Sequence, residues 1–229
     1  MTHEPKLFIY DLDGILTDTA EFHFLAWQKL AESLGISFDR AFNEKLKGIN
    51  RMDSLDRILA LDPAIGELSD AEKLKLATQK NDYYLTLIEK ITPAHILPGM
   101  VTFLDANKKT DAKIALGSAS KNAPAILAKL GLTGYFDYIV DAGKVAKGKP
   151  DPETFTAAAD ALGVDYRDCI GIEDASAGVE AINQAGMFSV AVGDEDHLSH
   201  ADYLVADTSD LVFEEVIRQF QKKNAGYIS

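Results

Sequence analysis

Apolar residues fall into two patterns along this chain: short uninterrupted runs, and longer segments in which they recur with helical spacing. The run Leu7–Tyr10 contains strong β-formers and predicts a short buried strand, which Gly14 ends. Further runs predict strands over residues 113–117, 138–140, 169–172, 188–192 and 203–205. Helical segments that end before glycine lie among the later runs: 122–130, 152–162 with Asp151 as N-cap, and 175–185.

The stretch between the first strand and Pro93 contains helical patterns alone. Helices are predicted over 19–34, 39–46 and 52–61, and a capping box, Ser69-x-x-Glu72, opens a longer helix that runs towards residue 91. From Pro98-Gly99 onwards strands alternate with helices, which predicts an α/β fold with a doubly wound parallel sheet. We therefore expect a core formed by residues 1–16 and 93–229, with residues 17–92 inserted as a helical bundle.

Composition narrows the classes of partner. A chain of 229 residues with 47% apolar residues can bury a sizeable core, and its net charge of −13 disfavours nucleic acid and anionic membranes as partners. The single cysteine, Cys169, precludes an internal disulfide and is expected to be a buried structural thiol. Because no signal-peptide core and no membrane-length apolar run is found, we expect a soluble protein of a reducing cytoplasm.

Two carboxylates follow the first strand, at Asp11 and Asp13. In an open parallel sheet, ligands bind beyond the carboxyl ends of the strands, so these side chains are expected at the functional edge. Two neighbouring acids stay ionised only where a cation or a proton lies between them, which indicates Mg²⁺, an acid/base role, or both. A surface turn is the alternative for this motif alone, whereas an EF-hand loop is excluded because Ile15 stands where an oxygen ligand is needed.

Polar residues also follow the other predicted strands. The second strand leads to Ser118-Ala119-Ser120 and Asn122, the third is followed by Lys149, and the fourth ends at Glu173-Asp174. Each group has an ordinary explanation as a helix cap or a solvated loop, but together they predict a site for a phosphate bound with Mg²⁺.

Two further patterns are set aside. The stretch from Gly143 to Lys149 matches most of a nucleotide P-loop, but Pro150 follows where a Mg²⁺-binding hydroxyl is required. His197 and His200 could share a helix face, yet a pair without a third ligand is more often solvated than metal-bound.

These motifs resemble the haloacid dehalogenase superfamily: Asp11-Leu12-Asp13-Gly14 with Thr17-Asp18-Thr19, Ser118-Ala119-Ser120, Lys149-Pro150-Asp151-Pro152 and Gly171-Ile172-Glu173-Asp174. The resemblance implies that the helical insert is a cap domain and that Asp11 is a nucleophile forming an aspartyl phosphate. It also implies that Asp13 is the general acid and base, and that one Mg²⁺ is held by Asp11, the Asp13 carbonyl, Asp174 and, through water, Glu173. Lys149 would add positive charge, consistent with what phosphoryl transfer to a carboxylate requires.

Within that superfamily the insert resembles the cap of the β-phosphoglucomutase family. The resemblance rests on the loop 47–55 with His23, Trp27 and Lys80-Asn81-Asp82, and it implies that Arg51, Ser118 and Asn122 bind a second phosphate. His23 and Lys80 would meet the sugar and couple its presence to closure, and Thr19 would belong to the hinge or to its hydrogen bonding. The remaining candidate substrate-binding residues are Trp27, Lys47, Gly48, Asn50, Ser54, Ala119 and Ser120. Asn50 departs from the pattern, which leads us to expect serine or a similar small polar residue there.

The resemblance implies an isomerase that interconverts β-D-glucose 1-phosphate and glucose 6-phosphate, with glucose 1,6-bisphosphate as intermediate and activator, and we expect a monomer. A sugar-phosphate phosphatase on the same fold and a non-catalytic phosphosugar-binding module are the alternatives. Phosphonate hydrolysis would need a Schiff-base lysine such as Lys47 or Lys80, and the sequence indicates no apolar surroundings that would lower the pKa of either.

Overall fold

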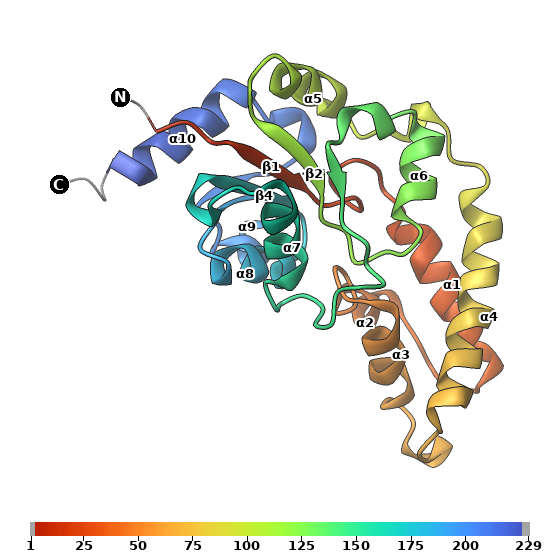
Figure 1. The fold of residues 1–229 in the computed structure, drawn as a ribbon. Helices are drawn as coiled ribbons and strands as arrows, with labels where there is room; N and C mark the ends of the chain where they lie inside the picture. The colour runs from red at the N-terminus through yellow and green to blue at the C-terminus, as the bar shows by residue number, and fades with distance from the viewer. Residues whose placement is uncertain (1–2, 226–229) are drawn as a thin grey trace.

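The computed structural model describes residues 3–225 and has a six-stranded parallel sheet at its centre (Figure 1). The strand order is β3-β2-β1-β4-β5-β6, so β1 lies inside the sheet between β2 and β4. The bounds are β1 Leu7–Tyr10, β2 Lys113–Leu116, β3 Tyr138–Ile139, β4 Cys169–Glu173, β5 Phe188–Val192 and β6 Tyr203–Val205. The prediction of an α/β fold with a doubly wound parallel sheet is confirmed.

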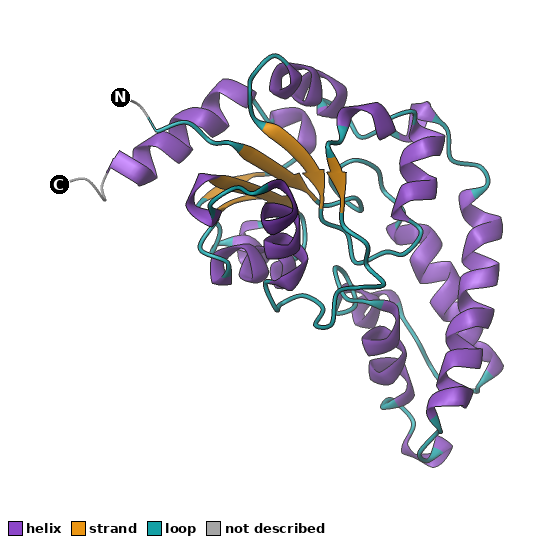
Figure 2. Ribbon diagram, in the orientation of Figure 1, coloured by secondary structure: helices purple, strands orange, loops and turns teal. Residues whose placement is uncertain are grey.

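Helices cover both faces of this sheet (Figure 2). One face packs against α5 (Met100–Lys108), α6 (Ala123–Leu130) and α10 (Phe213–Ala225), and the other against α7 (Glu153–Leu162) and α8 (Ser176–Gln184). A short helix, α9 (Glu195–Leu198), packs through Leu198 against α8 and β5. The 3₁₀ turns are Pro63–Ile65, Pro93–His95, Thr133–Tyr135, Tyr166–Asp168 and Thr208–Asp210.

Of the five α-helices between β1 and β2 in sequence, the first four form a separate layer beyond the carboxyl ends of the strands (Figure 1). They are α1 (Ala20–Ser33), α2 (Arg40–Glu44), α3 (Arg51–Leu59) and α4 (Asp70–Ile88), and they enclose their own apolar cluster around Trp27, Leu55 and Ile58. The predicted capping box is present at the start of α4, where Ser69 and Glu72 satisfy each other's backbone N–H groups.

The two chain segments that connect this layer to the sheet lie side by side. The Leu97 N–H donates to the Leu16 carbonyl at 3.0 Å, and Thr17 pairs with Ile96 as an isolated antiparallel bridge. The Thr17 hydroxyl donates to the His95 carbonyl at 2.8 Å. The entry and exit of the layer are thus joined to each other.

Several local expectations needed correction. The helix α5 was missed, and the N-cap of α7 is Pro152, although Asp151 still accepts the Glu153 N–H through its side chain. His197 lies in α9 but His200 follows that helix, so the two do not share a helix face.

Cys169 is buried as expected, and no helix within residues 3–225 is long and apolar enough to cross a membrane.

Candidate active site

Lys149 lies at the centre of a buried charge cluster at the carboxyl edge of the sheet. Asp11 directly follows β1, Glu173 ends β4, and Lys149 comes from the β3–α7 connection. The fully buried Lys149 ammonium donates to Asp11 Oδ1 at 2.8 Å and to Glu173 Oε1. Burial alone would lower the pKa of Lys149, but the charges and hydrogen bonds of the two carboxylates raise it above the usual value, so the side chain stays protonated.

Glu173 is held on both of its oxygens. Oε1 accepts from Lys149, and Oε2 accepts the backbone N–H groups of Asp174 and Ala175 at 2.9 and 2.8 Å. The first turn of α8 packs so closely here that a Cβ at Gly178 would lie 2.0 Å from Glu173 Oε1. Glycine at that position therefore lets the helix close over the carboxylate.

Three carboxylates form a group that fits a cation. Asp11, Glu173 and Asp174 each offer an oxygen, and these oxygens lie within 4.8 Å of one another. Burial, followed by the charges of Glu173 and Asp11, raises the pKa of Asp174 well above its usual value. A hard divalent cation would relieve this repulsion, and carboxylate oxygens are the ligands that Mg²⁺ prefers. Gly14, at φ +75°, is needed here because a Cβ would lie 2.2 Å from Asp174 Oδ2.

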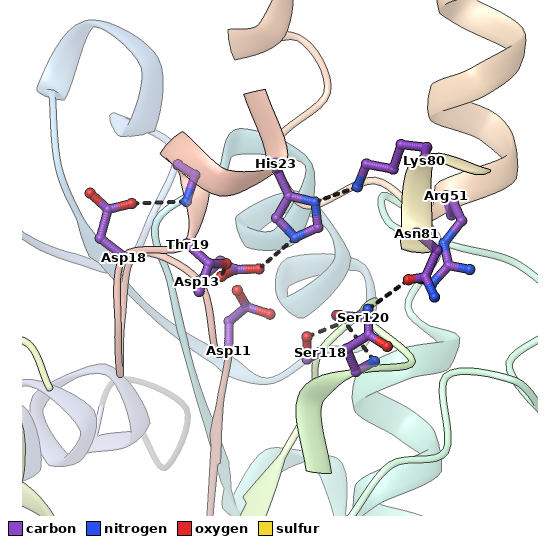
Figure 3. A network of polar contacts seen from close by, with 12 residues as sticks. Asp11, Asp13, Asp18, Thr19, His23, Arg51, Lys80, Asn81, Ser118 and Ser120 are labelled. Atoms are coloured by element: carbon purple, nitrogen blue, oxygen red, sulfur yellow. Dashed lines mark hydrogen bonds and ion pairs between the residues drawn. The ribbon is translucent and has the colours of Figure 1, made fainter. Parts of the chain in front are cut away.

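Asp13 faces the helical layer (Figure 3). The Thr19 hydroxyl donates to Asp13 Oδ1, and His23 Nε2 lies 3.7 Å from Oδ2. Burial, together with the charges of Asp11 and Asp18, raises the pKa of Asp13 to about 8. A carboxyl with that pKa can hold or release a proton near neutral pH, which suits a general acid and base.

Lys80 contacts the other side of His23. Its ammonium lies 2.9 Å from His23 Nδ1, 4.6 Å from the Trp27 ring centroid and 4.7 Å from that of Tyr84. Burial, followed by the charge of Arg51, lowers the pKa of Lys80 to about 7. The sequence-based statement that Lys80 has no apolar surroundings is therefore wrong, because the rings that enclose it come from α1 and from the next turn of α4.

Arg51 and Asn81 lie next to Lys80 (Figure 3) and form a second polar group with Asn122. Arg51 starts α3, Asn81 lies in α4, and Asn122 is the N-cap of α6 in the sheet layer. The Asn81 side-chain oxygen accepts from Arg51 at 2.7 Å and from Asn122 at 2.9 Å. Close to Asn122, the Ser118 hydroxyl accepts the Ser120 N–H at 3.1 Å.

A cavity of about 570 Å³ lies between the sheet edge and the α1–α4 layer. The predicted site residues that line it are Asp11, Asp13, His23, Trp27, Lys47, Gly48, Asn50, Arg51, Ser54, Lys80, Ser118, Ala119, Ser120, Asn122 and Asp174. Thr19, Lys149 and Glu173 do not line it, since they are buried behind Asp13 and Asp11.

Two residues of the 47–55 loop have local structural contacts as well. Asn50 caps α3 by accepting the Asp53 N–H at 3.0 Å, and its amide nitrogen donates to the Asp53 carboxylate at 2.6 Å. Lys47 pairs with Glu44 at 2.8 Å. The serine that the family pattern has in place of Asn50 is also a good N-cap residue, so capping accounts for this departure.

The motifs did not single out Asn81 as a site residue. Asn81 was named only as part of the Lys80-Asn81-Asp82 stretch that carries the family resemblance. No local sequence signal identifies a helical asparagine as the hydrogen-bond partner of Arg51 and Asn122, which lie 30 and 41 positions away. Lys121 and Met52 also line the cavity without having been predicted.

Comparison with known proteins agrees with this geometry. Residues 5–186 match the family model of the haloacid dehalogenase-like hydrolases. The chain is 48% identical to a β-phosphoglucomutase of Bacillus subtilis, over 95% of this chain and 96% of that protein. It is 32% identical to a fructose-1-phosphate phosphatase of Escherichia coli, over 80% and 94% of the two chains. A crystal structure of β-phosphoglucomutase from Clostridium difficile superimposes with a TM-score of 0.94 at 48% identity, covering 96% of this chain and 99% of that one.

Proposed function

This chain belongs to the haloacid dehalogenase-like hydrolase family, and we propose that it is a phosphomutase interconverting β-D-glucose 1-phosphate and D-glucose 6-phosphate. The 48% identity to a β-phosphoglucomutase over nearly the whole of both chains carries this proposal. The cavity supports it, because it has the cluster around Asp11 at one end and the Arg51 group at the other. A bisphosphorylated sugar needs a binding group at each end.

Asp11 is the nucleophile in this proposal. Its carboxylate attacks phosphorus while the bond from phosphorus to the sugar oxygen breaks, and Asp13 gives its proton to that oxygen. In the reverse half-reaction, Asp13 takes the proton from the sugar hydroxyl that attacks the phosphoryl group on Asp11. Lys149 fixes Asp11 and keeps a positive charge beside it, which lowers the repulsion between two anions.

Asp11, Asp174, the Asp13 carbonyl and, through water, Glu173 would hold one Mg²⁺. When bound there, it would supply positive charge that offsets the repulsion between the anionic Asp11 and an anionic phosphoryl group. Glu173 serves mainly to hold Lys149 and the start of α8, since both of its oxygens already accept hydrogen bonds.

The α1–α4 layer is the cap in this proposal, made by residues 17–92, and the core is assigned to 1–16 and 93–229, of which the structure describes 3–16 and 93–225. His23 and Lys80 meet the sugar and link its presence to Asp13, with Thr19 holding Asp13 from the hinge. The distal phosphate is bound by Arg51, Ser118 and Asn122. We propose further that the protein acts as a cytoplasmic monomer and that glucose 1,6-bisphosphate activates it by phosphorylating Asp11.

The first experiment separates a mutase from a phosphatase. Purified protein is mixed with Mg²⁺, β-glucose 1-phosphate and a trace of glucose 1,6-bisphosphate, and glucose 6-phosphate and free phosphate are followed in the same sample. Rapid glucose 6-phosphate with little phosphate supports the mutase. Phosphate release without isomerisation would contradict it and favour the phosphatase activity of the 32% identical relative.

Arg51→Ala tests the distal phosphate site. We expect loss of isomerisation by about 100-fold or more, because a charged hydrogen-bond partner of the second phosphate is removed. Phosphorylation of Asp11 by acetyl phosphate, which carries no second phosphate, should change little. Arg57→Ala is the matched control, since Arg57 lies on the same helix, is exposed and, within residues 3–225, hydrogen-bonds only to the Lys45 carbonyl. Equal loss of both reactions in Arg51→Ala would contradict the assignment.

The environment of Lys80 makes phosphonate hydrolysis a second candidate. An amine whose pKa is about 7 is neutral often enough to attack a carbonyl. Borohydride reduction in the presence of a phosphonate aldehyde would then trap a covalent adduct on Lys80, and the mutase predicts no adduct.

A further inference from the structure

At the end of the cavity away from Asp11, one neutral side chain, that of Asn81, connects Arg51 to Asn122. The Asn81 amide oxygen accepts from the Arg51 guanidinium, beside it in Figure 3, at 2.7 Å. It also accepts from the Asn122 amide at 2.9 Å. Arg51 and Asn81 belong to the α1–α4 layer, whereas Asn122 begins α6 on the sheet. Asn81 therefore connects the two layers at the place where the proposed second phosphate binds.

The orientation of the Asn81 amide follows from its partners. A guanidinium can only donate hydrogen bonds, and the Asn122 nitrogen that faces Asn81 is also a donor. The Asn81 oxygen must therefore point at both, and its two lone pairs are both used. Each partner keeps further N–H groups with which it can donate to another acceptor.

Arg51 has no carboxylate partner in the part of the chain that the structure describes. None of the ion pairs among residues 3–225, taken to 4.0 Å, includes its guanidinium. Asp82, which follows Asn81 on α4, is exposed and forms no ion pair with Arg51 within 4.0 Å. Burial lowers the pKa of Arg51, and the charge of Asp82, which acts on the guanidinium from farther away, works to raise it. The half-buried guanidinium is thus oriented by a neutral oxygen, which leaves its positive charge free to act on an anion.

We propose that Asn81 is a positioning residue of the distal phosphate site: it aligns Arg51 and Asn122 on one phosphate without neutralising the charge of Arg51. This inference rests on the proposed function, because it assumes a sugar with a phosphate at that end. It predicts that the neutrality of position 81 matters as much as its hydrogen bonds. An acidic acceptor of the same shape would hold both donors and still weaken phosphate binding.

The test compares Asn81→Ala, Asn81→Asp and a control, Gln79→Ala, on the exposed side of the same helix. We expect Asn81→Ala to raise the KM for β-glucose 1-phosphate about tenfold, since Arg51 and Asn122 lose their alignment, while kcat changes less. Asn81→Asp should raise it about 100-fold, because a carboxylate pairs with Arg51 and repels the phosphate. The Gln79→Ala variant should behave as the unmodified protein does.

A second readout separates positioning from a general structural role. Phosphorylation of Asp11 by acetyl phosphate does not use the distal site, so its rate should stay within about twofold in all variants. If Asn81 only ties the two layers together, Asn81→Asp would keep both hydrogen bonds and normal KM, and the proposal would be overturned. An unchanged KM in Asn81→Ala would overturn it as well. Should Asn81→Ala fail to fold, Asn81→Asp, which keeps the shape of the side chain, decides the matter.

Calorimetric binding of glucose 6-phosphate distinguishes this inference from the proposed function. If the unmodified protein does not isomerise its sugar phosphate, the proposed mutase activity fails. The same order of affinities, with the unmodified protein tightest and Asn81→Asp weakest, would still support the role of Asn81. Equal affinities of the unmodified protein, Asn81→Ala and Asn81→Asp for glucose 6-phosphate would overturn the positioning role of Asn81, even if the protein is an active mutase.

Discussion

Replacing Lys149 by Met tests how the charge cluster stabilises the fold. Methionine keeps most of the volume of the side chain but removes the ammonium that lies between Asp11 and Glu173, whose side chains are 6% and 0% exposed. Removing one partner of a buried ion pair costs about 3–5 kcal/mol, because the remaining charge stays buried without compensation. For a chain of this size each kcal/mol lowers Tm by roughly 2–4 °C, so we expect Tm to fall by about 10 °C.

The assay is urea and thermal unfolding in EDTA, so that no divalent cation replaces the missing charge. Lys147→Met is the matched control: Lys147 is 76% exposed and lies 3.8 Å from Asp151, and surface pairs of this kind contribute about 0–1 kcal/mol. A Lys149→Met variant within about 1 kcal/mol of the unmodified protein would refute the electrostatic account.

The pH dependence of the same variant has a definite sign. Burial raises the pKa of Glu173, and the charge of Lys149 opposes that rise. Without Lys149 the pKa in the folded state climbs further above the unfolded value. A group of this kind stabilises the fold below its unfolded pKa and loses that contribution as the pH rises through the folded pKa. The stability deficit of Lys149→Met should therefore be smaller at pH 5 than at pH 8, and an equal deficit at both would count against this reasoning.

Three further changes address the chemistry of the cavity. Asp13→Asn should slow isomerisation by roughly 10³-fold, because no acid remains for the sugar oxygen, while phosphorylation by acetyl phosphate, followed by mass spectrometry, is largely kept. Gly14→Ala should raise the Mg²⁺ concentration that gives half of the maximal activity by about tenfold or more, because the alanine Cβ would clash with the Asp174 carboxylate. Titration of the activity with Mg²⁺ measures this concentration, and an unchanged value would contradict the prediction. Affinity for glucose 6-phosphate should fall as the pH rises above about 7, where Lys80 loses its proton, and Lys80→Arg should remove that dependence in calorimetry.

Much of the fold could be predicted because its signals are local. The strands and the capping box at Ser69 are visible in short stretches of sequence, and the strand ends led to Asp11, Lys149 and Glu173. The helix α5 was missed because its N-cap is Gly99, which has no side chain to act as a start signal.

What sequence could not supply are contacts between distant segments. The pKa of Lys80 depends on its burial, beside Trp27 from 53 positions away, and on the charge of Arg51, both of which follow from a helix packing that no periodicity specifies. Asn81 likewise acquires its partners only when α3, α4 and α6 meet. The sequence motifs therefore identified the proposed catalytic residues, but not the neighbours that set the pKa of Lys80 or orient Arg51.

The paired connections at Leu16–Leu97 and Thr17–Ile96 give the α1–α4 segment an unusual independence. Because the segment leaves and rejoins the sheet at one point, its length and content do not change the distance that the chain must close there. The helices could thus be exchanged for others as a single cassette while β1, with Asp11 behind it, stays in register. Such exchange would let one phosphoryl-transfer centre acquire new substrates without rebuilding its sheet.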